Sequence, residues 1–145
     1  MDIGELSSFL ADLGEPKFRA KQVFPRLNIG TPIEELTMLS KPLRQRLAAE
    51  TQSTLPTIER KLVSKIDGTV KYLFRLYDGS CIESVLMKYK HGNTICISSQ
   101  VGCRMGCTFC ASTIAGRVRN LTPAEMLDQV LFTQVDSGLP ISNIV

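Results

Sequence analysis

The sequence predicts an α+β protein in which short helices and antiparallel strands precede the first β-α-β unit of a parallel fold. Three observations lead to this prediction: helical spacing of apolar residues in the first fifty positions, strand-like runs punctuated by Asp-Gly pairs from Thr57, and a strand–loop–helix–strand order near the C-terminus. We expect a helical accessory domain over residues 1–52, an antiparallel β-meander over 53–92 and the start of the parallel core over 93–145.

The first fifty residues are expected to form short helices. Apolar residues at positions 3, 6, 10 and 13 keep a helical period that Gly14 ends, and a second helix is expected over about residues 17–27, weakened near its end by Pro25. The stretch Thr31-Pro32-Ile33-Glu34 is a capping-box pattern, and Ser40 caps a further helix.

The next region is expected to form a three-stranded antiparallel meander. Its strand-like runs are KLVSKI, VKYLFRLY and CIESVLMKY, and alternate residues from Val70 to Leu76 share one face. The turn KHGN leads to a further strand, TICIS, which is expected to run straight into a loop rich in cysteine.

A helix and a strand follow that loop. Thr122 and Glu125 form a capping box, Gly138 and Pro140 end the helix, and ISNIV begins a strand. The expected apolar stripe of the helix consists of Leu127, Val130, Leu131 and Val135. Because a single β-α-β unit leaves its sheet edge unpaired, we expect the sequence to be truncated.

Composition and charge bound the class of protein. The 145 residues are 43% apolar and 21% charged, which is typical of soluble globular protein. No apolar run approaches the roughly 20 residues of a membrane span, and the N-terminus lacks the pattern of a secretion signal, so we expect a cytoplasmic protein with no membrane partner. The net charge of +3 permits nucleic-acid binding without indicating it.

Cysteine spacing is the strongest chemical signal. Of five cysteines, three lie within eight positions, Cys103, Cys107 and Cys110, and an odd total is a poor disulfide framework. Three thiolates can hold a [4Fe–4S] cluster while one iron stays open to a small molecule, and Gly102 and Gly106 allow the tight backbone that this needs. The alternatives are a zinc site, which usually has a second ligand pair, or inert reduced thiols.

Longer motifs around the cysteines resemble a known family. CRMGCTFC is similar to the radical S-adenosylmethionine (SAM) signature, and TICISSQVGCRMGCTFCAST followed by GRVRNLT resembles the RlmN/Cfr family of radical adenine C2/C8 methyltransferases. LSKPLRQRL, DGTVKYLF and the Asp-Gly-x-x-IES run also resemble RlmN, whose pattern fits better than that of Cfr. The resemblance spans almost the whole chain and implies that the parallel core is the start of a radical SAM partial (β/α)6 barrel.

The resemblance implies a role for each matching residue. Cys103, Cys107 and Cys110 match the cluster ligands, and Phe109 matches the aromatic residue near the adenine of SAM. The remaining two matches are Cys96, as the resolving thiol that forms a transient disulfide, and Glu83, as the proton acceptor.

The resemblance also implies an activity and partners. It implies methylation of carbon 2 of adenine 2503 in 23S rRNA and of adenine 37 in tRNAs through a methyl-cysteine intermediate. The expected cofactors are a [4Fe–4S] cluster and SAM, and the expected reductant is flavodoxin or ferredoxin. The helical residues 1–52 resemble the RNA-binding accessory domain, and the full-length protein is expected to be a monomer.

Several of these residues also have an ordinary structural interpretation. Alone, Glu83 would be a solvated strand carboxylate and Cys96 a buried inert thiol. Cys81 is interpreted as packing and His91 as a solvated turn residue. Both arginines after the loop, Arg117 and Arg119, are equally compatible with contact to RNA and with a place on the barrel rim.

Two other functions stay open at this point. One is another radical SAM enzyme, such as a Cfr-like C8 methyltransferase; the other is a non-enzymatic iron–sulfur redox module. The cysteine that bears the methyl group in the family is expected downstream of residue 145, so the chain as given is expected to be inactive by itself.

Overall fold

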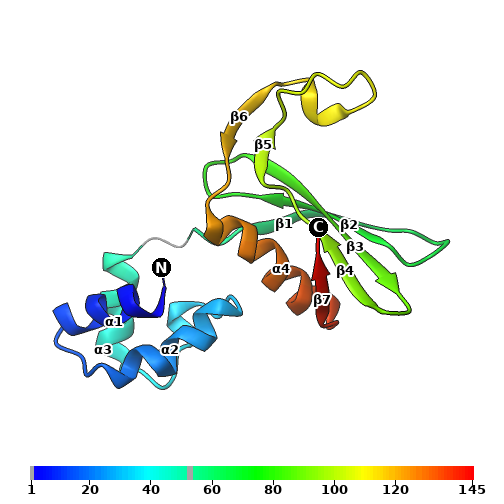
Figure 1. Cartoon of the computed structure of the whole chain (residues 1–145). Helices are drawn as coiled ribbons and strands as arrows, with labels where there is room; N and C mark the ends of the chain where they lie inside the picture. The colour runs from blue at the N-terminus through cyan, green and yellow to red at the C-terminus, as the bar shows by residue number, and fades with distance from the viewer. Residues whose placement is uncertain (1, 52–53) are drawn as a thin grey trace. The chain divides into compact units, whose positions relative to one another are not determined.

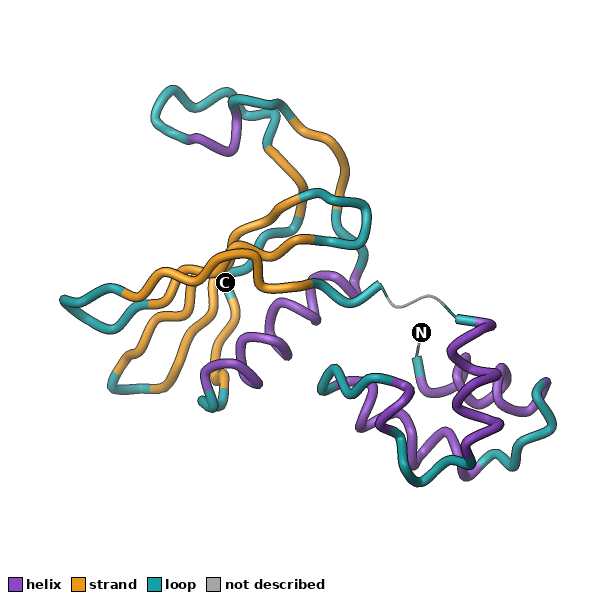
Figure 2. The backbone as a smooth tube through the Cα atoms, turned by 180° about the vertical axis from the view of Figure 1, so that it is seen from behind, coloured by secondary structure: helices purple, strands orange, loops and turns teal. Residues whose placement is uncertain are grey.

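The computed structural model describes residues 2–51 and 54–145, and the chain divides into two compact units, residues 1–53 and 54–145 (Figure 1). The expected boundary between residues 52 and 53 falls outside the described residues. Helices make up the first unit, and a mixed sheet with one long helix makes up most of the second (Figure 2).

The first unit contains α1 (Ile3–Asp12), α2 (Phe18–Asn28) and α3 (Lys41–Glu50). Asp2 and Glu5 form a capping box at the start of α1, and the Ser40 side chain accepts a hydrogen bond from the backbone N–H of Leu43 in α3. One apolar core joins the three helices, and its buried residues are Leu6, Leu10, Ala20, Val23, Leu36, Leu39, Leu43 and Leu47. The predicted helices at these positions are therefore confirmed.

The predicted helix start at Thr31 is wrong. Residues Ile33–Glu35 form a single 3-10 turn, η1, whose N-cap position is Pro32, and no side chain caps it. The turn does not continue into a longer helix, because Leu36 and Leu39, which follow it, are buried in the helical core. Tertiary burial thus overrides the local capping pattern.

Five strands form the main sheet of the second unit, in the order β1-β2-β3-β4-β7. Four of them are antiparallel neighbours, β1 (Thr57–Val63), β2 (Val70–Arg75), β3 (Cys81–Tyr89) and β4 (Gly92–Cys96). The fifth, β7 (Ile141–Ile144), is parallel to β4. Because β3 pairs with β4, the antiparallel meander and the parallel strand belong to one sheet.

The first strand is shifted from its predicted place. KLVSKI was expected to be a strand, but β1 ends at Val63, and Lys65 and Ile66 lie in the turn before β2. Ile66 is almost fully exposed there. In β2 the prediction is confirmed, because Val70, Tyr72 and Phe74 are all buried on one face.

Helix α4 (Pro123–Ser137) packs on that face of the sheet (Figure 1). Its predicted capping box between Thr122 and Glu125 is confirmed, and Gly138 ends it in the left-handed region at φ 66°. The buried Tyr72 hydroxyl donates a 2.7 Å hydrogen bond to Asp136, which also pairs with Lys61. Burial of the hydroxyl is the main cause that raises the pKa of Tyr72, and the nearby Asp136 carboxylate raises it further.

The predicted apolar stripe of α4 is partly wrong. Val130 is buried, but Leu127 and Val135 are half exposed or more. The face against the sheet instead buries Glu125, Gln129 and Thr133, which follow one another at intervals of four residues. Glu125 and Gln129 have hydrogen-bond partners for their buried polar groups, whereas the Thr133 hydroxyl has none within the described residues.

A two-stranded hairpin separates β4 from α4. The strand TICIS, which is β4, was expected to run straight into the cysteine loop, but β5 (Gln100–Gly102) and β6 (Arg117–Asn120) first pair in antiparallel fashion. The cysteines lie in the loop that connects these two strands (Figure 1). Within the described residues, no helix is long and apolar enough to cross a membrane.

Candidate functional site

The cysteine loop is held in place by backbone turns. Cys103, Cys107 and Cys110 are all reduced and partly exposed. The Cys110 N–H donates to the Cys107 carbonyl at 3.1 Å, and the Thr113 hydroxyl donates to the Cys110 carbonyl at 2.9 Å. A short 3-10 turn, η2 (Ala111–Thr113), follows the last cysteine.

Gly102 closes the base of this loop. Its φ is +69°, and a Cβ atom there would lie 1.9 Å from the carbonyl oxygen of Gly116 on the opposite arm. Only glycine fits such an approach. Gly106 also has a positive φ, +70°, but open space surrounds it. Gly106 is therefore favoured only by its backbone conformation, whereas Gly102 is required by the close approach of Gly116 as well.

The loop offers the kind of donors that an iron–sulfur cluster uses. Nowhere in residues 2–51 and 54–145 do three Cys, His, Asp or Glu side chains converge on one possible ion site. Each cysteine of a cubane cluster binds a different iron, so cluster ligands need not meet at one point. The loop sequence CRMGCTFCAST offers thiols and no carboxylate or imidazole. These residues therefore suit a [4Fe–4S] cluster.

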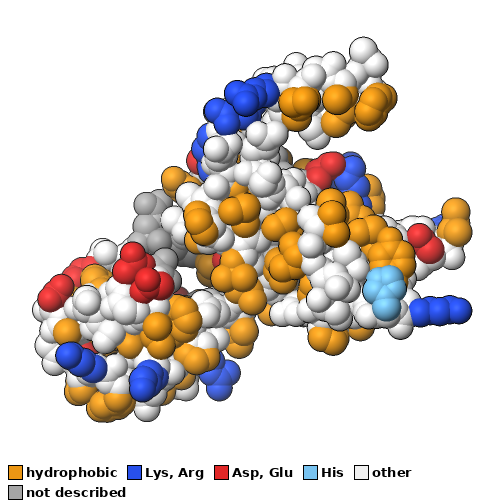
Figure 3. All heavy atoms as spheres, viewed as in Figure 1, with side chains coloured by type: hydrophobic (Ala, Val, Ile, Leu, Met, Phe, Trp, Pro, Cys, Tyr) orange, Lys and Arg blue, Asp and Glu red, His pale blue; other side chains and the backbone are white. Residues whose placement is uncertain are grey.

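Apolar side chains on the loop are strongly exposed. Met105, Ile114 and Phe109 are 74%, 86% and 91% exposed. Figure 3 shows hydrophobic side chains gathered along the outer part of the hairpin. Phe109, the residue predicted to lie near SAM, is thus accessible beside the cysteines.

Glu83 lies on β3, on the sheet face opposite α4. Its neighbours Ile82 and Ser84 point to the buried face, while Glu83 is exposed. One carboxylate oxygen pairs with Lys71 Nζ at 2.7 Å, and the Glu83 carbonyl accepts a 2.7 Å hydrogen bond from the Ser98 hydroxyl.

Cys96 lies on the same face as Glu83. It is the last residue of β4, it pairs with Val85, and it is partly exposed, so the expectation that it is buried is wrong. Because β4 leads into β5, the cysteine loop follows from the carboxyl end of the strand that carries Cys96. The fold thus brings Glu83 and Cys96 to one face beside the start of the loop.

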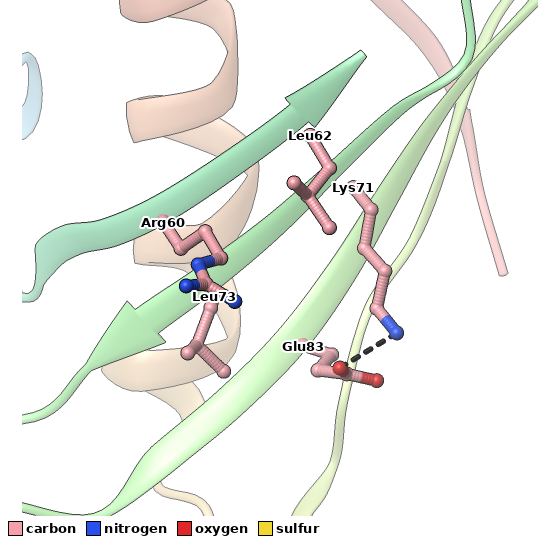
Figure 4. A pocket seen from close by; sticks show the side chains of 5 residues that line it. All are labelled: Arg60, Leu62, Lys71, Leu73 and Glu83. Carbon is pink, nitrogen blue, oxygen red and sulfur yellow. Dashed lines mark ion pairs between the residues drawn. The ribbon is translucent and has the colours of Figure 1, made fainter. Parts of the chain in front are cut away.

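A shallow depression of about 140 Å³ adjoins Glu83 on this face. Its lining residues are Arg60, Leu62, Lys71, Leu73 and Glu83, from β1, β2 and β3 (Figure 4). The depression is partly charged and partly apolar.

Sequence reasoning missed Gln129, which is fully buried on α4. Its side-chain oxygen accepts hydrogen bonds from the Ser84 hydroxyl at 2.7 Å and the Ser98 N–H at 2.9 Å. Its side-chain nitrogen donates to the Ser98 and Glu125 carbonyls. Gln129 therefore fixes Ser98, whose hydroxyl holds the Glu83 backbone; the polar four-residue spacing along α4 was the available signal.

Arg119 anchors the second arm of the hairpin. It forms two hydrogen bonds with Glu125, at 2.9 and 2.7 Å, and pairs with Asp78 at 2.8 Å. Hydrogen bonds to Glu125, and then to Asp78, raise the pKa of Arg119. The hydrogen bonds that Arg119 donates in turn lower the pKa of the Glu125 carboxyl. Arg117 donates to Asn120 within the same arm.

Two further sequence interpretations can be compared with the structure. Cys81 was expected to be packed, but it is exposed at the start of β3, so that expectation is wrong. His91 lies exposed in the β3–β4 turn, as expected, with its ring stacked on Tyr89 at 5.2 Å between centroids.

Comparison with known proteins gives matches over both units. The family model for the ribosomal RNA large subunit methyltransferase N-terminal domain, RlmN_N, matches residues 1–52. A probable dual-specificity RNA methyltransferase RlmN from Alkaliphilus metalliredigens is 60% identical over 97% of the chain and 40% of its own length. A protein of the same name from Alkaliphilus oremlandii is 56% identical over 100% of the chain and 43% of its own length.

A solved structure matches as well. The crystal structure of a radical SAM methyltransferase from Sphaerobacter thermophilus covers 99% of the chain with a TM-score of 0.85 and 39% identity, over 44% of its own length. The fold of the chain is therefore similar to that of a radical SAM methyltransferase. Residues 1–52 match the N-terminal domain of RlmN, and almost the whole chain is similar to curated RlmN methyltransferases, of whose length it spans about two fifths.

Proposed function

We propose that this chain provides the RNA-binding and cluster-binding parts of a radical SAM methyltransferase that methylates carbon 2 of adenine in RNA. The proposed targets are adenine 2503 of 23S rRNA and adenine 37 of tRNAs. The observation that carries the proposal is the 60% identity to an RlmN methyltransferase over 97% of the chain, which includes the complete cysteine loop. This observation also favours methyl transfer over a redox module.

In this proposal β4, α4 and β7 are the first elements of a partial (β/α)6 barrel. Helices cover the outside of such barrels, so the face opposite α4, which bears Glu83 and Cys96, would line the interior. Ligands of parallel barrels bind at the carboxyl ends of the strands, which is where the cysteine loop follows β4.

Cys103, Cys107 and Cys110 would hold the [4Fe–4S] cluster. When bound, the cluster and SAM supply the radical chemistry that adenine carbon 2 requires, since this electron-poor carbon does not attack a methyl sulfonium. Phe109, exposed on the same loop, would contact the adenine of SAM. Flavodoxin or ferredoxin is the proposed reductant.

Glu83 and Cys96 would complete the transfer. Glu83 would accept the proton from carbon 2 of the target adenine. The Cys96 thiolate would then attack the cysteine sulfur that is linked to the base, forming a disulfide as the carbon–sulfur bond breaks, and the released methylene carbon would take up a proton from solvent to become the methyl group. In the family that second cysteine lies downstream of the region that this chain matches.

Spectroscopy of the chain tests the cluster assignment. After anaerobic reconstitution with iron and sulfide, the reduced chain should give a cluster paramagnetic resonance spectrum that changes when SAM is added, because SAM would bind the open iron. A spectrum that is indifferent to SAM would favour the redox module. Cys107→Ala should lose the cluster, whereas Cys81→Ala, an exposed cysteine outside the loop, should keep it.

Mass spectrometry of RNA tests the substrate. Ribosomal and transfer RNA from a strain that lacks the gene should lose 2-methyladenosine, and the full-length gene product should restore it. If 2-methyladenosine is unchanged in both RNA pools, the substrate assignment is wrong; a new C8-methylated base would point to the Cfr-like activity.

A further inference from the structure

Two rows of side chains cross the sheet on the face that bears Glu83. Arg60, Leu73 and Glu83 are register partners across β1, β2 and β3. The next row runs through Leu62, Lys71, Val85 and Cys96, across four strands. Directly paired residues project to the same side of a sheet, so these rows lie next to each other on one surface.

Positive charge exceeds negative charge in this depression. Lys71 pairs with Glu83 at 2.7 Å, and both side chains are about half exposed, at 46% and 51%. Within the described part of the chain, Arg60 has no hydrogen bond or ion pair, and its side chain lies beside Leu73, its register partner on β2 (Figure 4). The depression therefore holds two cations, Arg60 and Lys71, and one carboxylate, Glu83, with Leu62 and Leu73 between them, so a single anionic group would balance its charge.

We propose that Arg60 and Lys71 form a subsite for a backbone phosphate of the RNA strand that carries the target adenine. The inference rests on the proposed role of Glu83, because a nucleotide whose base contacts Glu83 must have its own phosphates nearby. Arginine can bind two phosphate oxygens at once, and lysine supplies a point charge beside it.

Occupation of this subsite changes the partner of Lys71. An exposed lysine–glutamate pair is weak, so exchange of the carboxylate for a phosphate costs little. Lys71 then pairs with the phosphate, and Glu83 is left without a cation partner while it faces the base. RNA binding would thus free the carboxylate that is proposed to accept the proton.

The salt dependence of RNA binding by the 145-residue chain tests the subsite. Binding of a fluorescent tRNA transcript would be followed by anisotropy over a range of salt concentrations. Lys71→Met and Arg60→Met should each weaken binding about fivefold and lower the slope of log affinity against log salt by about 0.7 to 1, the value for one lost phosphate contact. Lys71→Arg, which keeps the charge, should bind like the unaltered chain; weakened binding by this variant would mean that Lys71 acts through its packing and not through its charge.

Two matched variants separate this subsite from general surface charge. Lys65→Met removes a lysine from the β1–β2 turn, outside the depression, and should leave affinity and slope unchanged. Glu83→Gln frees Lys71 and should strengthen binding about threefold. If Lys71→Met and Arg60→Met behave like Lys65→Met, or if the unaltered chain shows no salt-dependent RNA binding, the subsite is refuted.

The outcomes distinguish the subsite from the proposed function. Altered slopes without 2-methyladenosine formation by the full-length gene product would leave the phosphate subsite standing and reject the methyltransferase. Formation of 2-methyladenosine by the full-length gene product, with salt slopes unaltered in Lys71→Met and Arg60→Met, would support the methyltransferase and reject the phosphate subsite.

Discussion

Glu83 and Cys96 lie on the same face of adjacent strands, because Cys96 pairs with Val85 and Glu83 precedes Val85 by two residues on β3. Thirteen positions apart in sequence, the two residues become neighbours through the antiparallel register of β3 and β4. In the proposed reaction Glu83 acts on the base and Cys96 on the sulfur linked to that base, and this register allows both to reach one adduct.

Removal of the Cys96 thiol should stop the reaction after the base is attached to protein. In the full-length gene product, Cys96→Ser should lower turnover at least 100-fold, because a hydroxyl does not attack the linking sulfur as a thiolate does. The proposed chemistry further predicts that RNA stays covalently bound, which denaturing gel electrophoresis would detect. Cys81→Ser is the matched control and should turn over normally; loss of activity in both variants would point to misfolding instead.

Replacement of Gly102 should disrupt the cysteine loop. In Gly102→Ala the new methyl group would overlap the Gly116 carbonyl, so the hairpin must separate at its base. We expect reconstituted iron to fall below about a third of the wild-type content. Gly106→Ala has a similar positive φ but open surroundings, so its cost should be limited to backbone strain of about 1 kcal/mol, with iron retained. Equal iron loss in both variants would contradict the close-approach explanation.

Local sequence patterns were sufficient to predict the elements whose boundaries or buried face are set by neighbouring residues in the sequence. The alternation from Val70 to Leu76 predicted the buried face of β2, and the Thr122 capping box predicted the start of α4. The β5–β6 hairpin could not be predicted in this way, because its short strands, such as Arg117–Asn120, are largely polar and pair across a long loop.

The site was only partly accessible from sequence. Cysteine spacing by itself indicated the cluster loop, whereas the roles of Glu83 and Cys96 came from family resemblance. Their shared face depends on strand register, and the burial of Gln129 depends on partners 31 and 45 residues away. Non-local polar contacts of this kind leave little trace in hydrophobic periodicity.

Gln129 should contribute more to stability than the apolar Leu127 on the same helix. Gln129→Leu leaves the Ser98 N–H and the Ser84 hydroxyl without their partner, at a cost of about 3 kcal/mol in the free energy of unfolding. Leu127 is 50% exposed, so Leu127→Ala should change that free energy by less than about 1 kcal/mol. Urea denaturation of the chain would measure both changes in the free energy of unfolding. A larger loss for Leu127→Ala than for Gln129→Leu would instead support the apolar stripe predicted from sequence.

The Glu125–Arg119 contact should make folding sensitive to acid. Hydrogen bonds from Arg119, opposed by burial and assisted by Thr122, lower the pKa of Glu125 below its ordinary value of 4.5. A carboxyl whose pKa is lower in the folded state binds protons more weakly there than in the unfolded chain. Its stabilising contribution is therefore fully present above about pH 4.5 and is lost as the pH falls through the lowered folded value.

The test compares the chain with Glu125→Gln across this range. At pH 7 the variant should be less stable by about 2 kcal/mol, because Arg119 loses a buried, charged partner. As the pH falls below 4.5, the unaltered chain should lose stability faster than the variant, so the difference between their free energies of unfolding should shrink. A difference that stays constant from pH 7 to pH 3 would mean that Glu125 acts by packing or capping, not by its charge.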